Sequence, residues 1–372
     1  MKKLFVLFLI IVFLTQINIL AMSQQTNYLN ESKKEEIVNY VKNQIIDIYS
    51  EYYNIPKIDV EIEYVDTTNN ELLVHTFVNF TKILKTKSAE DLPFVKGMIL
   101  ELENIEDNYE KMIKSDYINS VIRDLQNNYI GTEQEETSKF AIKIPMELKR
   151  ANNYEQEYSM FFIGDDGSTA TIQECKLPNE TLMINGGKAK IKNLKFAENE
   201  LRTTSVAQDY DRILARDYIR TWTDSCGSCH CFVCDSSKSV YNPKFQTHHN
   251  NDCANYVSQA INAGGIETNS KWKPGLATWY HTGHSRYGLV NYLVDNGLFF
   301  KTSDKYKACA GSVIMWTGKN ISHVGMVDQN DTITMTYCSH THDRKSYSFK
   351  YFSGIEFYVP NWDSYSGTWI SH

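Results

Sequence analysis

Cys253 lies where a nucleophilic cysteine is expected, at the start of a predicted helix. Asp252 can N-cap this helix by accepting a backbone N–H bond, and Gly264 and Gly265 can end it. A helix N-terminus carries roughly half a positive charge, which favours the thiolate and lowers a cysteine pKa. The spacing therefore predicts Cys253 as a nucleophile, with a buried structural cysteine as the alternative.

Two histidines follow at the ends of neighbouring predicted strands. Residues alternate with period two over 311–316, 322–328 and 332–339, which predicts three antiparallel strands. His323 starts the second strand, and His340 comes at the end of the third. Because adjacent antiparallel strands are hydrogen-bonded neighbours, we expect the two histidines to lie side by side.

The order cysteine, histidine, histidine supplies the roles that thiol catalysis needs. A thiolate attacks a carbonyl carbon, a base takes and returns the proton, and a third polar group fixes the tautomer of the base. We predict Cys253 as the nucleophile, His323 as the general base and acid, and His340 as the group that orients His323. Asp343 and Asp328 are the alternatives for the third role. The backbone N–H of Cys253 is expected to face the developing oxyanion.

Residues beside the predicted nucleophile complete the candidate site. We assign Asp252, Asn255 and Trp279 to contacts with the substrate or the oxyanion. Trp279, Tyr256 and Trp316 can line a cleft, although packing in the core is the favoured alternative for each aromatic side chain taken alone. No metal and no cofactor are expected in this site.

A second group of cysteines precedes the predicted nucleophile and has two competing interpretations. Its four members lie within nine residues: Cys226, Cys229, Cys231 and Cys234. Disulfides are the default in an exported protein, but C-x-x-C spacing near a histidine also binds zinc. We favour disulfides or a mixed arrangement. If this group pairs internally and Cys253 is free, at least one of Cys175, Cys309 and Cys338 is expected to stay unpaired.

The N-terminus has the pattern of a secretory signal peptide over residues 1–21. Lys2 and Lys3 precede an apolar run over 4–14, and Ala21 offers a small residue for cleavage. An uncleaved membrane anchor is the alternative, and no later stretch is apolar for long enough to span a bilayer. We therefore predict a secreted or cell-wall-associated protein. Its formal net charge of −7 argues against nucleic-acid binding through a basic surface.

The chain is long enough for two domains, and we predict a separate N-terminal α+β accessory domain over residues 22–195. It opens with an amphipathic helix over 33–53, with Ile46 on the buried stripe. The other expected elements are strands over 58–64, 72–80, 139–148, 154–162 and 169–175 and helical residues over 88–128. A helix followed by antiparallel strands resembles cystatin- or NTF2-like accessory domains. A polar run over 196–205 predicts a linker, and residues 206–372 form the second domain.

Ordered motifs in the second domain resemble those of a known family. The most specific is Asp252-Cys253-Ala254-Asn255-Tyr256-Val257-Ser258-Gln259. The others are Tyr210-Asp211-Arg212 with Ala215, Tyr218 and Trp222, then Tyr241-Asn242-Pro243, Ala263-Gly264-Gly265, Gly311-Ser312-Val313-Ile314, His323, and His340-Thr341 with Arg344. With these motifs, residues 206–360 resemble the putative amidase domain family, a papain-like branch related to the NlpC/P60 and CHAP amidases. Ala254 stands where the family commonly has threonine, and the cysteine-rich segment between Trp222 and Tyr241 departs from the usual pattern.

The resemblance implies a papain-like, NlpC/P60-type fold for the second domain and cysteine-dependent hydrolysis of amide bonds, often in cell-wall peptides. We therefore expect a secreted hydrolase that works through a thioester on a peptide or peptidoglycan substrate. The alternatives are a cysteine protease or acyltransferase acting on protein, a non-catalytic cell-wall binding module, and a zinc-dependent interaction protein. No nucleic-acid partner is expected, and no stable membrane span remains once the signal peptide is removed.

Overall fold

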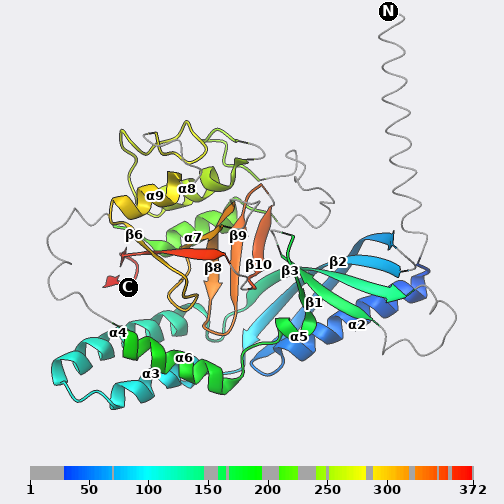
Figure 1. Cartoon of the computed structure of the whole chain (residues 1–372), viewed down its shortest axis with the longest axis horizontal. Coiled ribbons are helices and arrows are strands. Elements are labelled where there is room, and N and C mark those ends of the chain that lie inside the picture. Colours follow the sequence, from blue (N-terminus) through cyan, green and yellow to red (C-terminus); the bar gives the residue numbers. More distant parts are fainter. Residues whose placement is uncertain are drawn as a thin grey trace, which may run out of the picture.

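The protein is an α+β structure organised around one large mixed sheet (Figure 1). The computed structural model describes residues 29–68, 71–145, 158–164, 167–194, 209–224, 240–248, 251–281, 288–317, 323–341, 343–350 and 354–370. The predicted α+β class is confirmed. The predicted signal peptide, residues 1–21, lies outside these ranges, as does the predicted linker over 196–205. Within the described residues, no helix combines the length and the hydropathy needed to cross a bilayer.

The N-terminal half contributes five strands and five helices to the described structure. Its strands are β1 Tyr53–Thr68, β2 Glu71–Leu84, β3 Gln134–Pro145, β4 Ser159–Ile163 and β5 Thr169–Thr171. Its helices are α2 Glu31–Tyr49, α3 Pro93–Glu103, α4 Asn108–Asn128, α5 Ile172–Cys175 and α6 Glu180–Asn193, with a short 3₁₀ turn over Ala89–Asp91.

The C-terminal half contributes the remaining strands and the helices that cover them. The strands are β6 Phe299–Thr302, β7 Val313–Trp316, β8 His323–Asn330, β9 Met335–Ser339, β10 Arg344–Ser348 and β11 Ile355–Pro360, with the small pair β12 Trp362–Asp363 and β13 Thr368–Trp369. The helices are α7 Arg212–Thr221, α8 Cys253–Ala263 and α9 Gly288–Asp295. The predicted meander of β7, β8 and β9 is confirmed.

Helix α2 packs on β1 and carries most of the buried stripe predicted for it. Asn30 caps its start by accepting a bond from the backbone N–H of Lys33. The prediction for Ile46 is wrong: its side chain is 45% exposed, and Ile48 is buried instead. One residue turns a helix by about 100°, so a neighbour of a buried position readily faces solvent. The helix also ends before Tyr53, where the edge strand β1 begins and accommodates a proline.

Two other predicted elements differ from the structure. The helical segment expected over 88–128 is divided into α3 and α4. The strand expected over 169–175 stops after three residues, because Thr171 and Glu174 form a capping box that starts α5. Helix α6 was not predicted. Its Gly187 packs so closely on α3 that a Cβ there would lie 1.9 Å from the carbonyl oxygen of Phe94.

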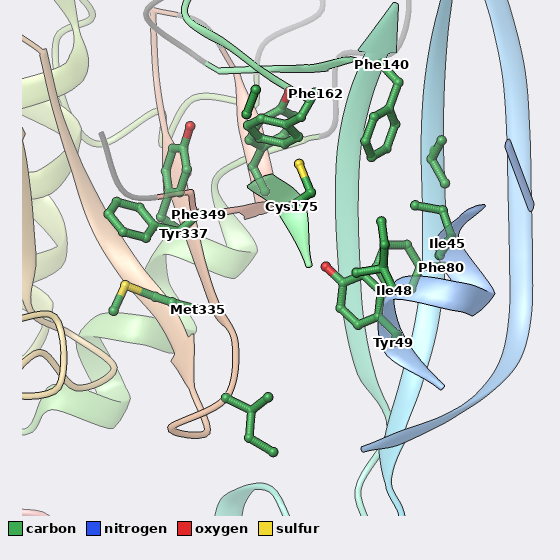
Figure 2. Close-up of a cluster of buried hydrophobic side chains, with 14 of the residues drawn as sticks. Ile45, Ile48, Tyr49, Phe80, Phe140, Phe162, Cys175, Met335, Tyr337 and Phe349 are labelled. Carbon is green, nitrogen blue, oxygen red and sulfur yellow. The ribbon is translucent and has the colours of Figure 1, made fainter. Parts of the chain in front are cut away.

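The two halves share one sheet and one core, and the division of the chain into two domains stays a prediction. The strand order is β1-β2-β3-β10-β9-β8-β7-β11-β6, with β4 on β3 and β5 on β4. Strands β3 and β10 join the halves through a parallel pairing of Thr137 with Tyr347. The largest core cluster contains Ile45 and Phe80 from the first half and Tyr337 from the second (Figure 2).

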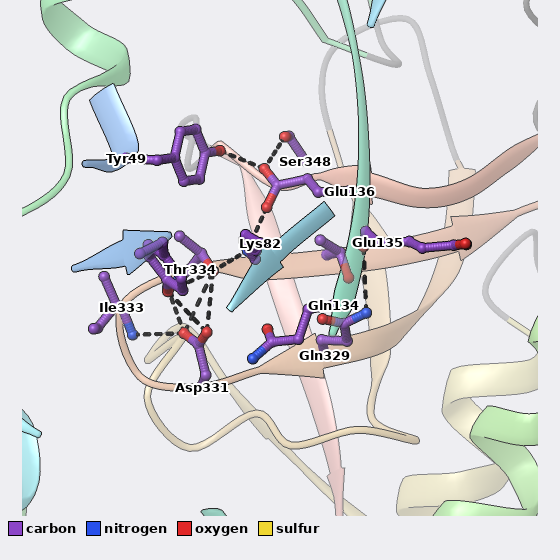
Figure 3. Close-up of polar contacts among 12 residues, drawn as sticks. Tyr49, Lys82, Gln134, Glu135, Glu136, Gln329, Asp331, Ile333, Thr334 and Ser348 are labelled. Carbon is purple, nitrogen blue, oxygen red and sulfur yellow. Dashed lines mark hydrogen bonds and ion pairs between the residues drawn. The ribbon is translucent and has the colours of Figure 1, made fainter. Parts of the chain in front are cut away.

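A buried polar cluster also joins the halves (Figure 3). The carboxylate of Glu136 in β3 accepts bonds from Tyr49 of α2, Lys82 of β2 and Ser348 of β10. Glu136 and Lys82 are 1% and 0% exposed, so their ion pair is fully withdrawn from water. Tyr53 donates to Asp331 in the β8–β9 turn at 2.8 Å. Side chains of the first half therefore fix the hairpin that carries His323 and His340 at its other end.

Candidate active site

Cys253 is the first residue of α8, as predicted, and the helix ends at Ala263 before Gly264. The helix packs on β8 and β9, with Val257 and Ile261 in the same buried cluster as residues of β8. In Figure 1, α7, α8 and α9 lie together on one side of the C-terminal strands. This packing brings the start of α8 to the start of β8.

The Cys253 thiol is hydrogen-bonded to the side chain of His323, the first residue of β8. Burial acts to raise the pKa of the thiol. The bond to His323, the charge of that ring, and the backbone N–H groups of Val324 and Ala254 act the other way and leave the pKa below its ordinary value. A partly ionised thiol beside an imidazole is the arrangement that activates a cysteine nucleophile.

The imidazole of His323 is buried where β7 and β8 pair. His323 pairs with Trp316 across β7 and β8, and the centroids of their two rings are 5.2 Å apart. Its side chain is 6% exposed. The sheet therefore fixes the position of the predicted base, His323. Its bond to Cys253 identifies the thiol as the group from which it takes a proton.

His340 bonds groups other than His323 through both of its ring nitrogens. Nδ1 lies 2.9 Å from Oδ2 of Asp252, and Nε2 lies 2.6 Å from the carbonyl oxygen of Trp222. The ring also stacks on Tyr256, with centroids 3.8 Å apart. Groups from two other elements, Asp252 and the backbone of Trp222, therefore hold both ring nitrogens of His340.

Asp252 does not cap α8 in the way that we predicted. Its backbone is helical, with φ −86° and ψ −11°, and its side chain makes no capping bond. The carboxylate instead accepts from the backbone N–H of His248 at 2.8 Å and from Nδ2 of Asn255 at 2.9 Å, besides pairing with His340. These bonds occupy the carboxylate, which therefore does not cap the first turn of α8.

Asn255 and Trp279 extend this network below the nucleophile. Nε1 of Trp279 donates to Oδ1 of Asn255 at 2.7 Å, and Nδ2 of Asn255 donates to the carbonyl oxygen of Gln246 as well as to Asp252. Asp252, Asn255 and Trp279 are all at least 98% buried. Their predicted contact with the substrate is not tested, and their burial favours a role in holding the start of α8.

The two aspartates considered for the third role lie in different surroundings. Asp328 accepts bonds from Arg220 of α7 and from Thr336 at 3.0 Å, five residues along β8 from His323. Asp343 is buried, and its charge acts on the Tyr256 hydroxyl under His340. Both aspartates stay alternatives to His340 for the third role. Tyr256 and Trp316 are buried in the core, so the packing alternative is confirmed for both.

Sequence reasoning missed the groups that hold the pair of Asp252 and His340 in place. The backbone N–H of Asp252 donates to Oγ1 of Thr341 at 3.2 Å, and Thr341 has a φ of 80°. The carbonyl oxygen of Trp222 is an acceptor for His340. The adjacent pair His340-Thr341 was a visible signal, because both side chains reach Asp252. A backbone carbonyl leaves no such signal in a sequence.

The described cysteines other than Cys253 are free thiols, as at least one was predicted to be. These are Cys175, Cys309 and Cys338. Burial raises the pKa of the Cys338 thiol and raises that of Cys309 to about 11. The four-cysteine group over 226–234 lies outside the described residues, so its disulfide and zinc interpretations stay open. Among the residues that the structure describes, no group of three or more histidine, cysteine or acidic side chains is placed to hold a metal.

Comparison with known families places the site within a known domain. Residues 209–359 match the family model of the putative amidase domain. The C-terminal region is similar to this family. The match confirms the resemblance predicted from the motifs and supports hydrolysis of amides, and Cys253, His323 and His340 all fall inside the matched residues. No curated protein and no solved structure matches the chain.

The lowered pKa of Cys253 predicts its reactivity. Iodoacetamide should alkylate Cys253 with a midpoint below the ordinary thiol pKa of about 8.5, because alkylation follows the thiolate. Replacing His323 with glutamine removes two of the causes that lower the pKa, so the midpoint should rise. Peptide mass spectrometry across a pH series measures this at Cys253 itself. Cys338 is the internal control and should stay unmodified, and equal rates at both thiols would contradict the prediction.

Proposed function

We propose that the protein is a cysteine-dependent amide-bond hydrolase. The observation that carries this proposal is the hydrogen bond between the Cys253 thiol at the start of α8 and the buried imidazole of His323. A nucleophile joined to its base, inside a domain of an amidase family, supports acyl transfer through sulfur.

The reaction divides into two acyl transfers. The proton of Cys253 passes to His323, and the sulfur attacks the amide carbon while the carbonyl oxygen takes the negative charge. Backbone N–H groups at the start of α8, including that of Cys253, face the oxyanion. The imidazolium returns its proton to the leaving amine, which departs and leaves a thioester. Water, deprotonated by His323, then attacks the thioester, and the acid product leaves with the thiol restored.

In this proposal Asp252 and His340 are positioning residues. Their contact joins the residue before Cys253 to the end of β9. The carbonyl oxygen of Trp222 also contacts His340, and the hydroxyl of Thr341 accepts from the backbone N–H of Asp252. A fixed α8 start and a fixed sheet edge keep sulfur and imidazole at bonding distance, where proton transfer is efficient. Because both ring nitrogens of His340 are engaged elsewhere, Asp343 and Asp328 are the candidates that the proposal keeps for orienting His323.

The proposed fold family follows the same geometry. A cysteine at a helix start that packs on an antiparallel sheet carrying the histidine supports a papain-like, NlpC/P60-type arrangement. Helix α2 against β1 supports the cystatin- or NTF2-like resemblance of the first half. The proposed substrate is a cell-wall peptide, and the proposed location is outside the cell, since the sequence begins with a signal-like segment over 1–21.

Purified peptidoglycan tests this function. The chain from residue 22 should release soluble fragments with new carboxyl and amine termini, which mass spectrometry identifies and assigns to one bond. The same protein after treatment with iodoacetamide is the control and should release none. If no fragments appear although Cys253 alkylates quickly, the proposed cell-wall substrate is overturned. The proposed thiol chemistry then stands, and protein substrates are tested next.

A further inference from the structure

A cavity of about 440 Å³ lies between the two halves of the molecule. Tyr49 and Cys175 line it from the first half, and Met335 and Phe349 line it from the second (Figure 2). Its volume is that of a site for a small ligand. Its lining contains no residue of the candidate active site.

The cavity exists because the two parts of the sheet meet over a short length. The described residues of β3 and β10 pair at one position, Thr137 with Tyr347. The polar cluster around Glu136 ties the halves together beside it. Between these ties, the side chains of the first half and those of β9 line the cavity.

Two lysines line this cavity with their charges unbalanced. Among the described residues, no carboxylate lies within ion-pairing distance of Lys305 or Lys350. The ammonium of Lys350 instead donates to the carbonyl oxygen of Cys175 at 3.3 Å. Burial lowers the pKa of Lys305, and the charge of Lys350 lowers it further, while the neighbouring Asp304 acts the other way without forming an ion pair.

Lys305 and Lys350 are partly buried, and two more deeply buried lysines of the sheet show the contrast. Lys82 is paired with Glu136, and Lys139 is paired with Glu63. Buried lysines are normally paired in this way, because an isolated buried charge costs several kcal/mol. Lys350 lies in the field of Glu136, but the oxygens of that carboxylate already accept from Tyr49, Lys82 and Ser348. An anion is the missing partner for Lys305 and Lys350.

The remaining lining contains two carboxylates, Glu136 and Glu174, which already accept bonds from Lys82 and Thr171 respectively. It also contains apolar side chains that match an anion with an apolar body. Met335, Phe349 and Leu177 present apolar surface. Thr332 also lines the cavity, and its buried hydroxyl has no hydrogen-bond partner within the described part of the chain. Thr332 has a φ of 76°, a conformation that costs a β-branched residue energy and that is found at ligand sites.

We propose that this cavity binds a small organic anion, with its carboxylate or phosphate between Lys305 and Lys350 and its apolar part against Met335 and Phe349. The site is separate from Cys253, and the proposal does not depend on the amidase function. Benzoate and phenyl phosphate are suitable probes, because each joins one aromatic ring to one anionic group. Benzyl alcohol is the neutral counterpart of benzoate.

Thermal unfolding of the full chain with each probe tests the site, because a ligand that binds the folded state raises Tm. Benzoate or phenyl phosphate should raise Tm at millimolar concentration, at constant ionic strength, and benzyl alcohol should not. The probe with the larger shift identifies the head group. Lys305→Met and Lys350→Met should each weaken binding about tenfold or more, since each removes a charged hydrogen bond. Lys87→Met, at an exposed lysine outside the cavity, is the matched control and should bind as the wild type does.

Three results would overturn the proposal. They are equal shifts from benzoate and benzyl alcohol, no shift from either anion, and an undiminished shift in both methionine variants. If a methionine variant does not fold, Lys305→Gln and Lys350→Gln remove the charge and keep a polar end of similar length. Amide hydrolysis is measured in parallel, and its rate should not depend on whether the cavity binds an anion.

Discussion

Replacement of Cys253 with alanine is expected to reduce kcat for amide hydrolysis by at least about 10⁴-fold. Alanine has no sulfur, so no thioester forms, and only binding and the oxyanion contacts remain to accelerate the reaction. The side chain is small and partly exposed at the first turn of α8, so the fold should survive the change. Rates on the peptide bond identified from peptidoglycan fragments, with Tm as a check on folding, measure this prediction.

Cys309→Ala is the matched control for that experiment. Cys309 is also a free, partly exposed cysteine of the amidase domain, but burial raises the pKa of its thiol to about 11. It lies next to Ser312, away from His323, and its replacement should leave kcat within a few-fold of the wild type. A Cys253→Ala variant that keeps a tenth or more of the activity would show that another group is the nucleophile.

The position of Cys253 was predictable because its signals are local. A short polar residue before the helix, two glycines after it and apolar residues at helical spacing all lie within a few turns. His323 was predictable for a similar reason, since period-two alternation marks the strand that begins with it. The capping role of Asp252 was wrong because its partner, His340, is distant in sequence and competes with the local cap.

The continuity of the sheet was beyond sequence reasoning. Strands β3 and β10 come from opposite halves of the chain, and the residue pattern of neither strand predicts that the two will pair. Glu136 and Lys82 lie outside the strands that we predicted over 139–148 and 72–80, and charged residues are mostly exposed, although both of these are buried. Their burial depends on Ser348 and Thr334, which the second half supplies. Burial of a charged residue cannot be predicted from its local sequence when a distant segment of the chain covers it.

Removal of Lys82 should destabilise the whole molecule. Lys82→Met leaves Glu136 charged and buried without its cation, which costs about 3–5 kcal/mol in comparable pairs. Because Glu136 also bonds Tyr49 and Ser348, one from each half, the loss should appear in a single transition that unfolds both. Urea unfolding at neutral pH, followed by tryptophan fluorescence and by circular dichroism, measures the change. Lys57→Met at the exposed pair with Asp59 is the control and should not move the midpoint.

The stability lost in Lys82→Met should change with pH in a direction that the pKa of Glu136 determines. Burial acts to raise the pKa of Glu136, but the charges of Lys82 and Lys350 and the bonds from Lys82 and Ser348 leave it below the ordinary value. A folded pKa below the unfolded one gives stability that is present above the unfolded pKa, about 4.3, and lost as the pH falls through the folded pKa. The difference between wild type and Lys82→Met should therefore be largest near neutral pH and shrink in acid. A difference that is constant with pH, or two transitions that separate in the variant, would show that the pair does not join the halves.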